Sequence, residues 1–137
     1  GLAPVRQLGL EHHVHFPGYL DGENYVGMLK AFDVKVFLVP GSDGTCRAVR
    51  ECMAMRKPAV VADRGMLREI VEHEKDGLVC DGSAESLFRA LDRLASDRRL
   101  AHRMGLAARE TAATRYSLEA QATAVKAIYE RVLIRGG

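Results

Sequence analysis

Two acidic residues, Asp43 and Glu51, have a spacing that could serve chemistry on a small ligand. Seven residues separate them, and the first lies in Pro40-Gly41-Ser42-Asp43-Gly44, a sequence typical of a loop before a helix. A carboxylate that faces a cleft can accept hydrogen bonds from two neighbouring hydroxyls, which suits a ribose or another sugar. Local pattern alone also allows a plain interpretation, in which Asp43 stabilises the turn and Glu51 is solvated on a helix.

The same loop suits a phosphate group. Gly41 and Gly44 leave backbone N–H groups open to close approach, and the start of the following helix favours an anion. In open parallel α/β sheets, ligands bind at the carboxyl ends of the strands. Two further loops, Asp63–Gly65 and Asp81–Ser83, follow other predicted strands. We therefore expect a ligand site where these loops meet, centred on residues 41–45.

Short apolar runs alternate with helical patterns along the first half, and the second half is helical. We predict strands at 14–16, 34–39, 59–62 and 78–80, and helices at 24–32, 45–55, 66–71, 85–95, 98–114 and 118–133. Asp97 and Ser117 are suited to begin the last two helices as N-caps. Strands that are continuous apolar runs are typical of parallel sheets. The prediction is an α/β fold with a parallel sheet of about four strands, flanking helices and a helical C-terminal end.

Composition limits the class of protein. A chain of 137 residues fits one domain, residues 1–137. The net charge of +2, from 20 basic and 18 acidic residues, is too weak for a dedicated nucleic-acid binder. The three cysteines form no CxxC pair, which favours reduced thiols in the cytosol. No apolar run reaches the ~20 residues that a membrane span needs, and no signal peptide is seen.

Other reactive residues give weaker signals. His12, His13 and His15 are close in sequence, but no further ligands accompany them and zinc sites need three or four, so we expect no metal. Cys46 lies near a helix start, where a thiolate is favoured. No His/Asp constellation accompanies it, which argues against a catalytic cysteine.

The order of motifs along the chain resembles the retaining glycosyltransferases of family 4, which have the two-domain, Rossmann-like GT-B fold. The resemblance rests on Val36-Phe37-Leu38-Val39-Pro40-Gly41-Ser42-Asp43-Gly44, Arg50-Glu51-Cys52-Met53-Ala54-Met55 and Lys57-Pro58-Ala59-Val60-Val61-Ala62. It continues through Leu8-Gly9-Leu10, Val14-His15-Phe16-Pro17-Gly18, Arg68-Glu69-Ile70-Val71, Asp76-Gly77-Leu78-Val79, Met104-Gly105, Ala108-Arg109 and Tyr116-Ser117. The family's acidic pair, with seven residues between, matches Asp43 and Glu51.

The resemblance implies a role for each matching residue. Glu51 would hold the ribose hydroxyls of a nucleoside-diphosphate sugar, and Asp43 would orient its sugar. The remaining donor-binding residues would be Gly41, Ser42, Gly44, Thr45, Cys46, Arg47 and Gly65. The family works without a metal or other cofactor and stabilises the leaving diphosphate with basic groups and a helix start.

The chain also departs from the family pattern at several positions. Asp43 is one methylene shorter than the usual Glu. Thr45 and Cys46 stand where an aromatic residue and a glycine are common, and Arg64 replaces a small residue in the next loop. These departures bear on sugar contacts more than on ribose contacts.

The resemblance further implies a partial C-terminal, donor-binding domain, truncated at its N-terminal side. The family's acceptor domain and the first two strands of its donor domain have no counterpart in this sequence. In the family's sheet, those two strands would lie between the strands that correspond to 14–16 and 34–39. We expect a glycosyltransferase as part of a longer protein, inactive as this chain alone. The expected partners are the nucleotide sugar, the acceptor domain and a second copy through the open sheet seam, but no nucleic acid.

The expected location is the cytoplasm, with membrane-surface association at the inner face as an option for the full protein. The expected process is bacterial cell-envelope or polysaccharide biosynthesis. The alternative is a non-catalytic nucleotide-binding or protein-interaction module of Rossmann-like fold. A receiver-like signalling module fits less well, because residues 14–16 provide no acidic cluster at the end of an early strand.

Overall fold

The computed structural model describes residues 2–40 and 43–135, and within them a three-stranded parallel sheet. The strands β1 (Lys35–Phe37), β2 (Ala59–Ala62) and β3 (Gly77–Cys80) lie in that order. Val36 pairs with Val60, and Val60 with Leu78, so β2 is central. The predicted α/β class with a parallel sheet is confirmed, with three strands in place of about four.

The predicted strand at residues 14–16 was wrong. This segment has no regular structure, and Phe16 is 57% exposed. Three residues followed by Pro17-Gly18 form no strand unless a neighbour pairs their backbone groups, and no described strand lies beside them. The edge of β1 away from β2 is therefore open in the described part of the chain.

The helices agree with the predicted spans to within a few residues, apart from α1, which the sequence did not indicate. They are α1 (Leu2–Gln7), α2 (Gly22–Ala31), α3 (Asp43–Ala54), α4 (Leu67–Ile70), α5 (Ala84–Ser96), α6 (Arg98–Arg115) and α7 (Leu118–Arg135). Both predicted N-caps are confirmed. The Asp97 carboxylate accepts from the Leu100 N–H at 2.9 Å, and the Ser117 hydroxyl accepts from the Ala120 N–H at 3.1 Å.

Helices cover both faces of the sheet, because successive residues of a strand point to opposite sides. Ala59 and Val61 of β2 face α3, α4 and the second half of α6, whereas Val60 faces α5 and the first half of α6. The first core cluster comprises Cys46, Val49, Met53, Ala59, Val61, Leu67, Ile70, Val71, Ala108 and Ala112. The second comprises Val60, Leu78, Cys80, Leu94, Leu100 and Met104. This double covering explains why β2 is completely apolar.

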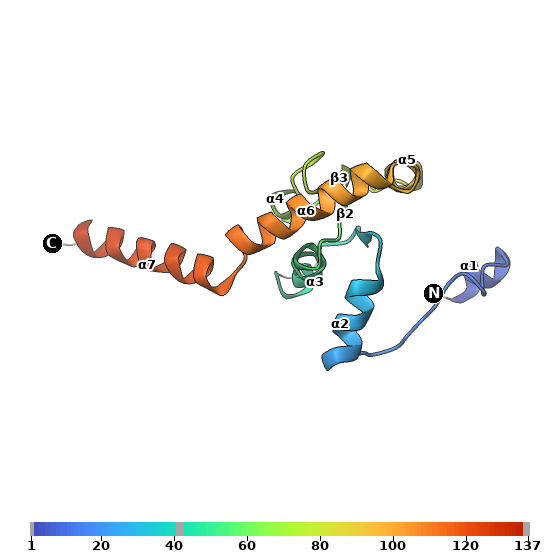
Figure 1. Cartoon of the computed structure of the whole chain (residues 1–137), viewed down its shortest axis with the longest axis horizontal. Helices are drawn as coiled ribbons and strands as arrows, with labels where there is room; N and C mark the ends of the chain where they lie inside the picture. The colour runs from blue at the N-terminus through green and yellow to red at the C-terminus, as the bar shows by residue number, and fades with distance from the viewer. Residues whose placement is uncertain (1, 41–42, 136–137) are drawn as a thin grey trace.

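The two ends of the chain extend away from this core. Figure 1 shows α7 projecting beyond α6 at one end, and α1 on the other side, joined to α2 by an extended segment. Helix α7 carries exposed apolar side chains, among them Val125, Ile128, Tyr129, Val132 and Leu133. None of the helices in the described ranges has both the length and the apolar character needed to cross a bilayer.

Candidate functional site

Helix α3 supplies the central carboxylate of the candidate site. Its inner face carries Val49, Cys52 and Met53, all fully buried against the sheet and neighbouring helices. Helical periodicity then turns Arg47 and Glu51, one turn apart, away from that core. Arg47 is exposed and Glu51 is half-buried. The apolar face of α3 thus fixes the backbone, and its other face presents a cation and a carboxylate.

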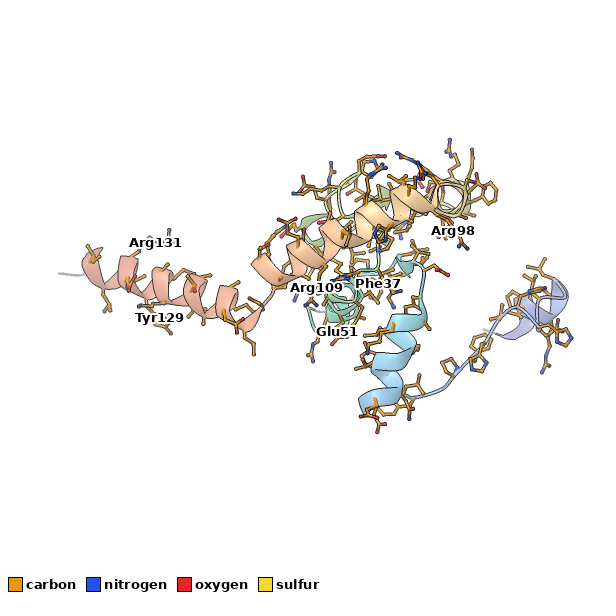
Figure 2. All side chains as sticks on the ribbon, in the orientation of Figure 1. Phe37, Glu51, Arg98, Arg109, Tyr129 and Arg131 are labelled. Carbon is orange, nitrogen blue, oxygen red and sulfur yellow. The ribbon has the colours of Figure 1, made fainter. Side chains whose placement is uncertain are left out.

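Helix α2 packs against α3 and contacts this carboxylate directly. The Tyr25 hydroxyl donates a 2.5 Å hydrogen bond to Oε2 of Glu51. Figure 2 shows Glu51 on α3, on the side where α2 lies. The hydrogen bond to Glu51 raises the pKa of Tyr25 to about 12, and partial burial adds to the effect. The hydroxyl therefore remains a donor at neutral pH.

An open cavity of about 670 Å³ lies between the start of α2 and the outer face of α3. Its lining combines two carboxylates, one guanidinium and two tyrosine rings, contributed by Tyr19, Leu20, Asp21, Gly22, Tyr25, Arg47, Ala48 and Glu51. Carboxylates accept hydrogen bonds from hydroxyls, the guanidinium binds anions, and a tyrosine ring offers a flat apolar face. The cavity can therefore bind a ligand that carries hydroxyls, an anion and a planar group.

The predicted site residues are placed by the structure to different extents. Arg47 and Glu51 line the same cavity. Gly41 and Ser42 lie outside the described residues. Asp43, Gly44 and Thr45 form the first turn of α3, and their side chains are also outside what the structure describes. Asp43 is thus the first helical residue, whereas the sequence placed it in the loop.

Cys46 was predicted at the site, but its side chain is fully buried in the core with Val49 and Met53. Any contact from Cys46 to a ligand would have to come from its backbone. The thiols of Cys46, Cys52 and Cys80 are all free and buried. Burial raises the pKa of the Cys52 thiol, which keeps it protonated and inert.

Gly65, in the loop after β2, lies close to Pro40 in the loop after β1. Its φ of +52° is in the left-handed region, and a Cβ atom there would lie 3.2 Å from Pro40 Cβ. Both loops leave the carboxyl ends of neighbouring parallel strands, as expected. Gly65 therefore lies beside the loop that leads into α3, the region where the sequence placed it.

The carboxylates of the two other predicted loops are occupied within the protein. Asp63 forms a 3.0 Å ion pair with Arg68. Asp81 accepts hydrogen bonds from the Ser83 N–H and the Ser86 hydroxyl at the start of α5. The Ser86 and Ser83 hydrogen bonds lower the pKa of Asp81 to about 2. These two residues stabilise local structure and do not extend the candidate site.

Tyr19, Asp21 and Tyr25 belong to the cavity but were not predicted as site residues. Tyr25 lies in the helix predicted at 24–32, but a hydrogen bond between its hydroxyl and a carboxylate 26 positions away leaves no local signal in the sequence. Among the described residues, no three potential metal ligands lie close enough together to hold an ion.

The parallel sheet covered on both faces, with a polar cavity beside the helix after β1, defines a Rossmann-like α/β domain. The chain belongs to the glycosyl transferases group 1 family, whose model matches residues 3–111. The resemblance to a glycosyltransferase family is thereby confirmed at this level.

Individual relatives agree with this assignment. The putative glycosyltransferase YtcC of Bacillus subtilis (strain 168) is 27% identical over 133 residues, which is 94% of this chain and 33% of that protein. The sucrose-phosphate synthase of Thermosynechococcus elongatus has the same fold, with a TM-score of 0.80 at 24% identity over 98% of this chain and 34% of that one.

Alr3699/HepE of Anabaena, solved in complex with UDP and glucose, has a TM-score of 0.78 at 25% identity, covering 91% of this chain and 34% of that one. The chain thus spans about a third of the length of these proteins.

Proposed function

We propose that this chain is the donor-binding part of a retaining, family-4-like glycosyltransferase of the GT-B fold. It binds a nucleoside-diphosphate sugar, and the complete protein transfers the sugar to an acceptor. The observation that carries the proposal is the half-buried Glu51 carboxylate, presented with Arg47 and two tyrosines in one cavity. Membership of the glycosyl transferases group 1 family supports the reaction class.

The nucleoside would occupy the cavity beside α3. Glu51 has two oxygens with about four acceptor positions, of which Tyr25 uses one, so the vicinal ribose hydroxyls can both bind. The rings of Tyr19 and Tyr25 offer apolar faces to the base. A similar protein, HepE of Anabaena, was solved with UDP and glucose, which supports a nucleotide and a sugar as the ligand parts.

The diphosphate and the sugar would extend from Glu51 toward the start of α3. Asp43 begins this helix, eight residues before Glu51, so their backbones are about 12 Å apart along its axis at ~1.5 Å per residue. Over this length, a nucleotide sugar can contact Glu51 through its ribose and Asp43 through its sugar. The N-terminal N–H groups of α3 and Arg47 would stabilise the diphosphate between them.

The acceptor would come from the remainder of the protein. This chain spans about a third of its relatives, and a transferase must enclose both substrates to exclude water. We expect donor binding by this chain and no useful transfer without an acceptor domain. No cofactor and no metal enter this scheme, because the helix start and the guanidinium supply the positive charge.

Isothermal titration of the chain with UDP, GDP, ADP and their sugar conjugates tests the proposal. Glu51→Gln keeps the shape of the side chain but removes its charge, and should weaken binding about 10- to 100-fold, the range for hydrogen bonds to a charged group. Glu119→Gln, an exposed position on α7, is the control and should bind like the wild type. A folded chain that binds none of these nucleotides, or equal affinities for wild type and Glu51→Gln, would refute the donor site.

A further inference from the structure

The Glu51 carboxylate is held by a residue from a different helix. Tyr25 of α2 donates to Oε2 across the boundary between α2 and α3, and both side chains are partly buried there. The Tyr25 hydroxyl is thus a hydrogen-bond donor to this carboxylate from outside its own helix. The contact lies at the wall of the cavity and joins two of its lining residues.

We propose that Tyr25 is a positioning residue, which fixes the Glu51 carboxylate in the orientation that accepts the two ribose hydroxyls. This inference rests on the proposed function, since it assigns Glu51 to ribose. It adds a residue from α2 to a site that the motif spacing placed entirely in the loops and α3. Tyr25 itself need not touch the hydroxyls.

The geometry indicates that Tyr25 orients the Glu51 carboxylate and does not compete with the ribose hydroxyls for it. A glutamate side chain has three rotatable bonds and is mobile when solvated, whereas a tyrosine has two and is anchored here by the helix α2. The hydroxyl occupies one acceptor position on Oε2 and does not itself occupy Oε1. The carboxylate therefore enters the binding reaction already ordered, and less conformational entropy is lost when the ribose binds.

The donor character of Tyr25 is maintained under ordinary conditions. Its pKa of about 12 keeps the hydroxyl protonated at neutral pH, so it donates and the carboxylate accepts. The direction matters, because a carboxylate oxygen that accepts from Tyr25 has further lone pairs with which it can accept from the ribose. A phenylalanine at this position would retain the ring as a cavity wall and lose only the donor.

Binding of a ribonucleotide and its 2′,3′-dideoxy analogue by Tyr25→Phe tests the inference. The probe is whichever of UDP, GDP and ADP the wild type binds, measured by calorimetry. The variant should bind the ribonucleotide about 2- to 10-fold more weakly, the range for one hydrogen bond. It should bind the dideoxy nucleotide like the wild type, because that ligand makes no demand on Glu51. In a Glu51→Gln background, Tyr25→Phe should have no further effect.

Each other result would overturn the inference. Equal weakening of both nucleotides would make Tyr25 a cavity wall that acts independently of Glu51. Stronger ribonucleotide binding would make it a competitor for the carboxylate, and no change would leave it without a role. If the wild type binds no nucleotide, or Glu51→Gln binds normally, the proposed function itself fails and the inference fails with it. Tyr129→Phe, on the distant α7 (Figure 2), controls for the substitution.

Discussion

Thr111 Oγ1 on α6 donates a 2.8 Å hydrogen bond to Oδ2 of Asp76, and both side chains are buried. The other oxygen, Oδ1, accepts from the Glu72 N–H at 2.8 Å. Asp76 directly precedes β3, so the carboxylate joins the turn before that strand to the helix packed over it. A buried carboxylate is tolerable here because each of its oxygens has a donor.

Replacing Thr111 by valine should destabilise the fold. The variant keeps the shape of the side chain but leaves a buried carboxylate oxygen without its donor, which costs about 1.5–3 kcal/mol for a charged acceptor. Thr114→Val on the same helix is the control, because Thr114 is exposed and its hydroxyl bonds only to backbone carbonyls of its own helix. Urea unfolding gives both free energies. Equal losses for the two variants would contradict the structural role of the Asp76 bond.

Gly105 should tolerate no side chain, because α6 lies directly on the backbone of the turn after α3. A Cβ atom at Gly105 would lie 2.2 Å from the Arg56 carbonyl oxygen, which belongs to rigid backbone. Gly105→Ala should therefore cost about 1–3 kcal/mol or more in free energy of unfolding. Thermal and urea unfolding measure the change.

Gly27 in α2 is the matched control, since it is also a helical glycine but has no atom within 4 Å of an added Cβ. Gly27→Ala should raise the free energy of unfolding by up to about 1 kcal/mol, the difference in helix propensity. A Gly105→Ala variant as stable as Gly27→Ala would show that α6 does not pack as closely as described.

Alanine substitutions of two isoleucines should show how differently the core and the projecting helix α7 contribute to stability. Ile70 is 2% exposed in the core, and Ile128 is 52% exposed on α7. Ile70→Ala should cost about 2–5 kcal/mol, whereas Ile128→Ala should change the free energy of unfolding by about 0.5 kcal/mol or less. Denaturant titrations measure both. A large effect at Ile128 would mean that α7 packs against something in solution, either its own chain or a second copy.

The regular elements of the core were predictable because local pattern and tertiary environment agree there. The apolar run 59–62 is β2, buried on both faces, and the N-cap residues Asp97 and Ser117 begin α6 and α7 as expected. The strand prediction for 14–16 failed because so short a segment, with two apolar residues around His15, forms a strand only where a partner strand is available. Helix α1 has little apolar periodicity and gave no signal.

The candidate site was predictable only in part, for a related reason. The spacing of the acidic pair singled out Glu51, and the family resemblance added Arg47. Both line the cavity, because helical geometry places residues one turn apart on the same side. It could not show that Cys46 turns inward, since a small apolar side chain is compatible with either side of a helix start. Tyr25 depends on how two helices pack, which no single stretch of sequence encodes.

The ionisation of Tyr25 should depend on Glu51. Because the neutral hydroxyl donates to the carboxylate, its pKa is about 12, above the ordinary 10.0. NMR titration of ring-labelled tyrosines should show the Tyr25 pKa falling in Glu51→Gln. Tyr116, whose pKa is raised chiefly by its own burial, is the internal control and should not move.

The interaction between Tyr25 and Glu51 should also make the free energy of unfolding depend on pH. The pKa of Tyr25 is higher in the folded state than in the unfolded chain, so its hydrogen bond to Glu51 stabilises the fold fully below pH 10. This stabilisation is lost as the pH rises from 10 to about 12. The stability difference between wild type and Glu51→Gln should therefore be constant near neutral pH and shrink between pH 10 and 12. Urea unfolding of both proteins across this range measures it. A difference that stays constant to pH 12 would mean that the Tyr25–Glu51 bond contributes nothing to folding.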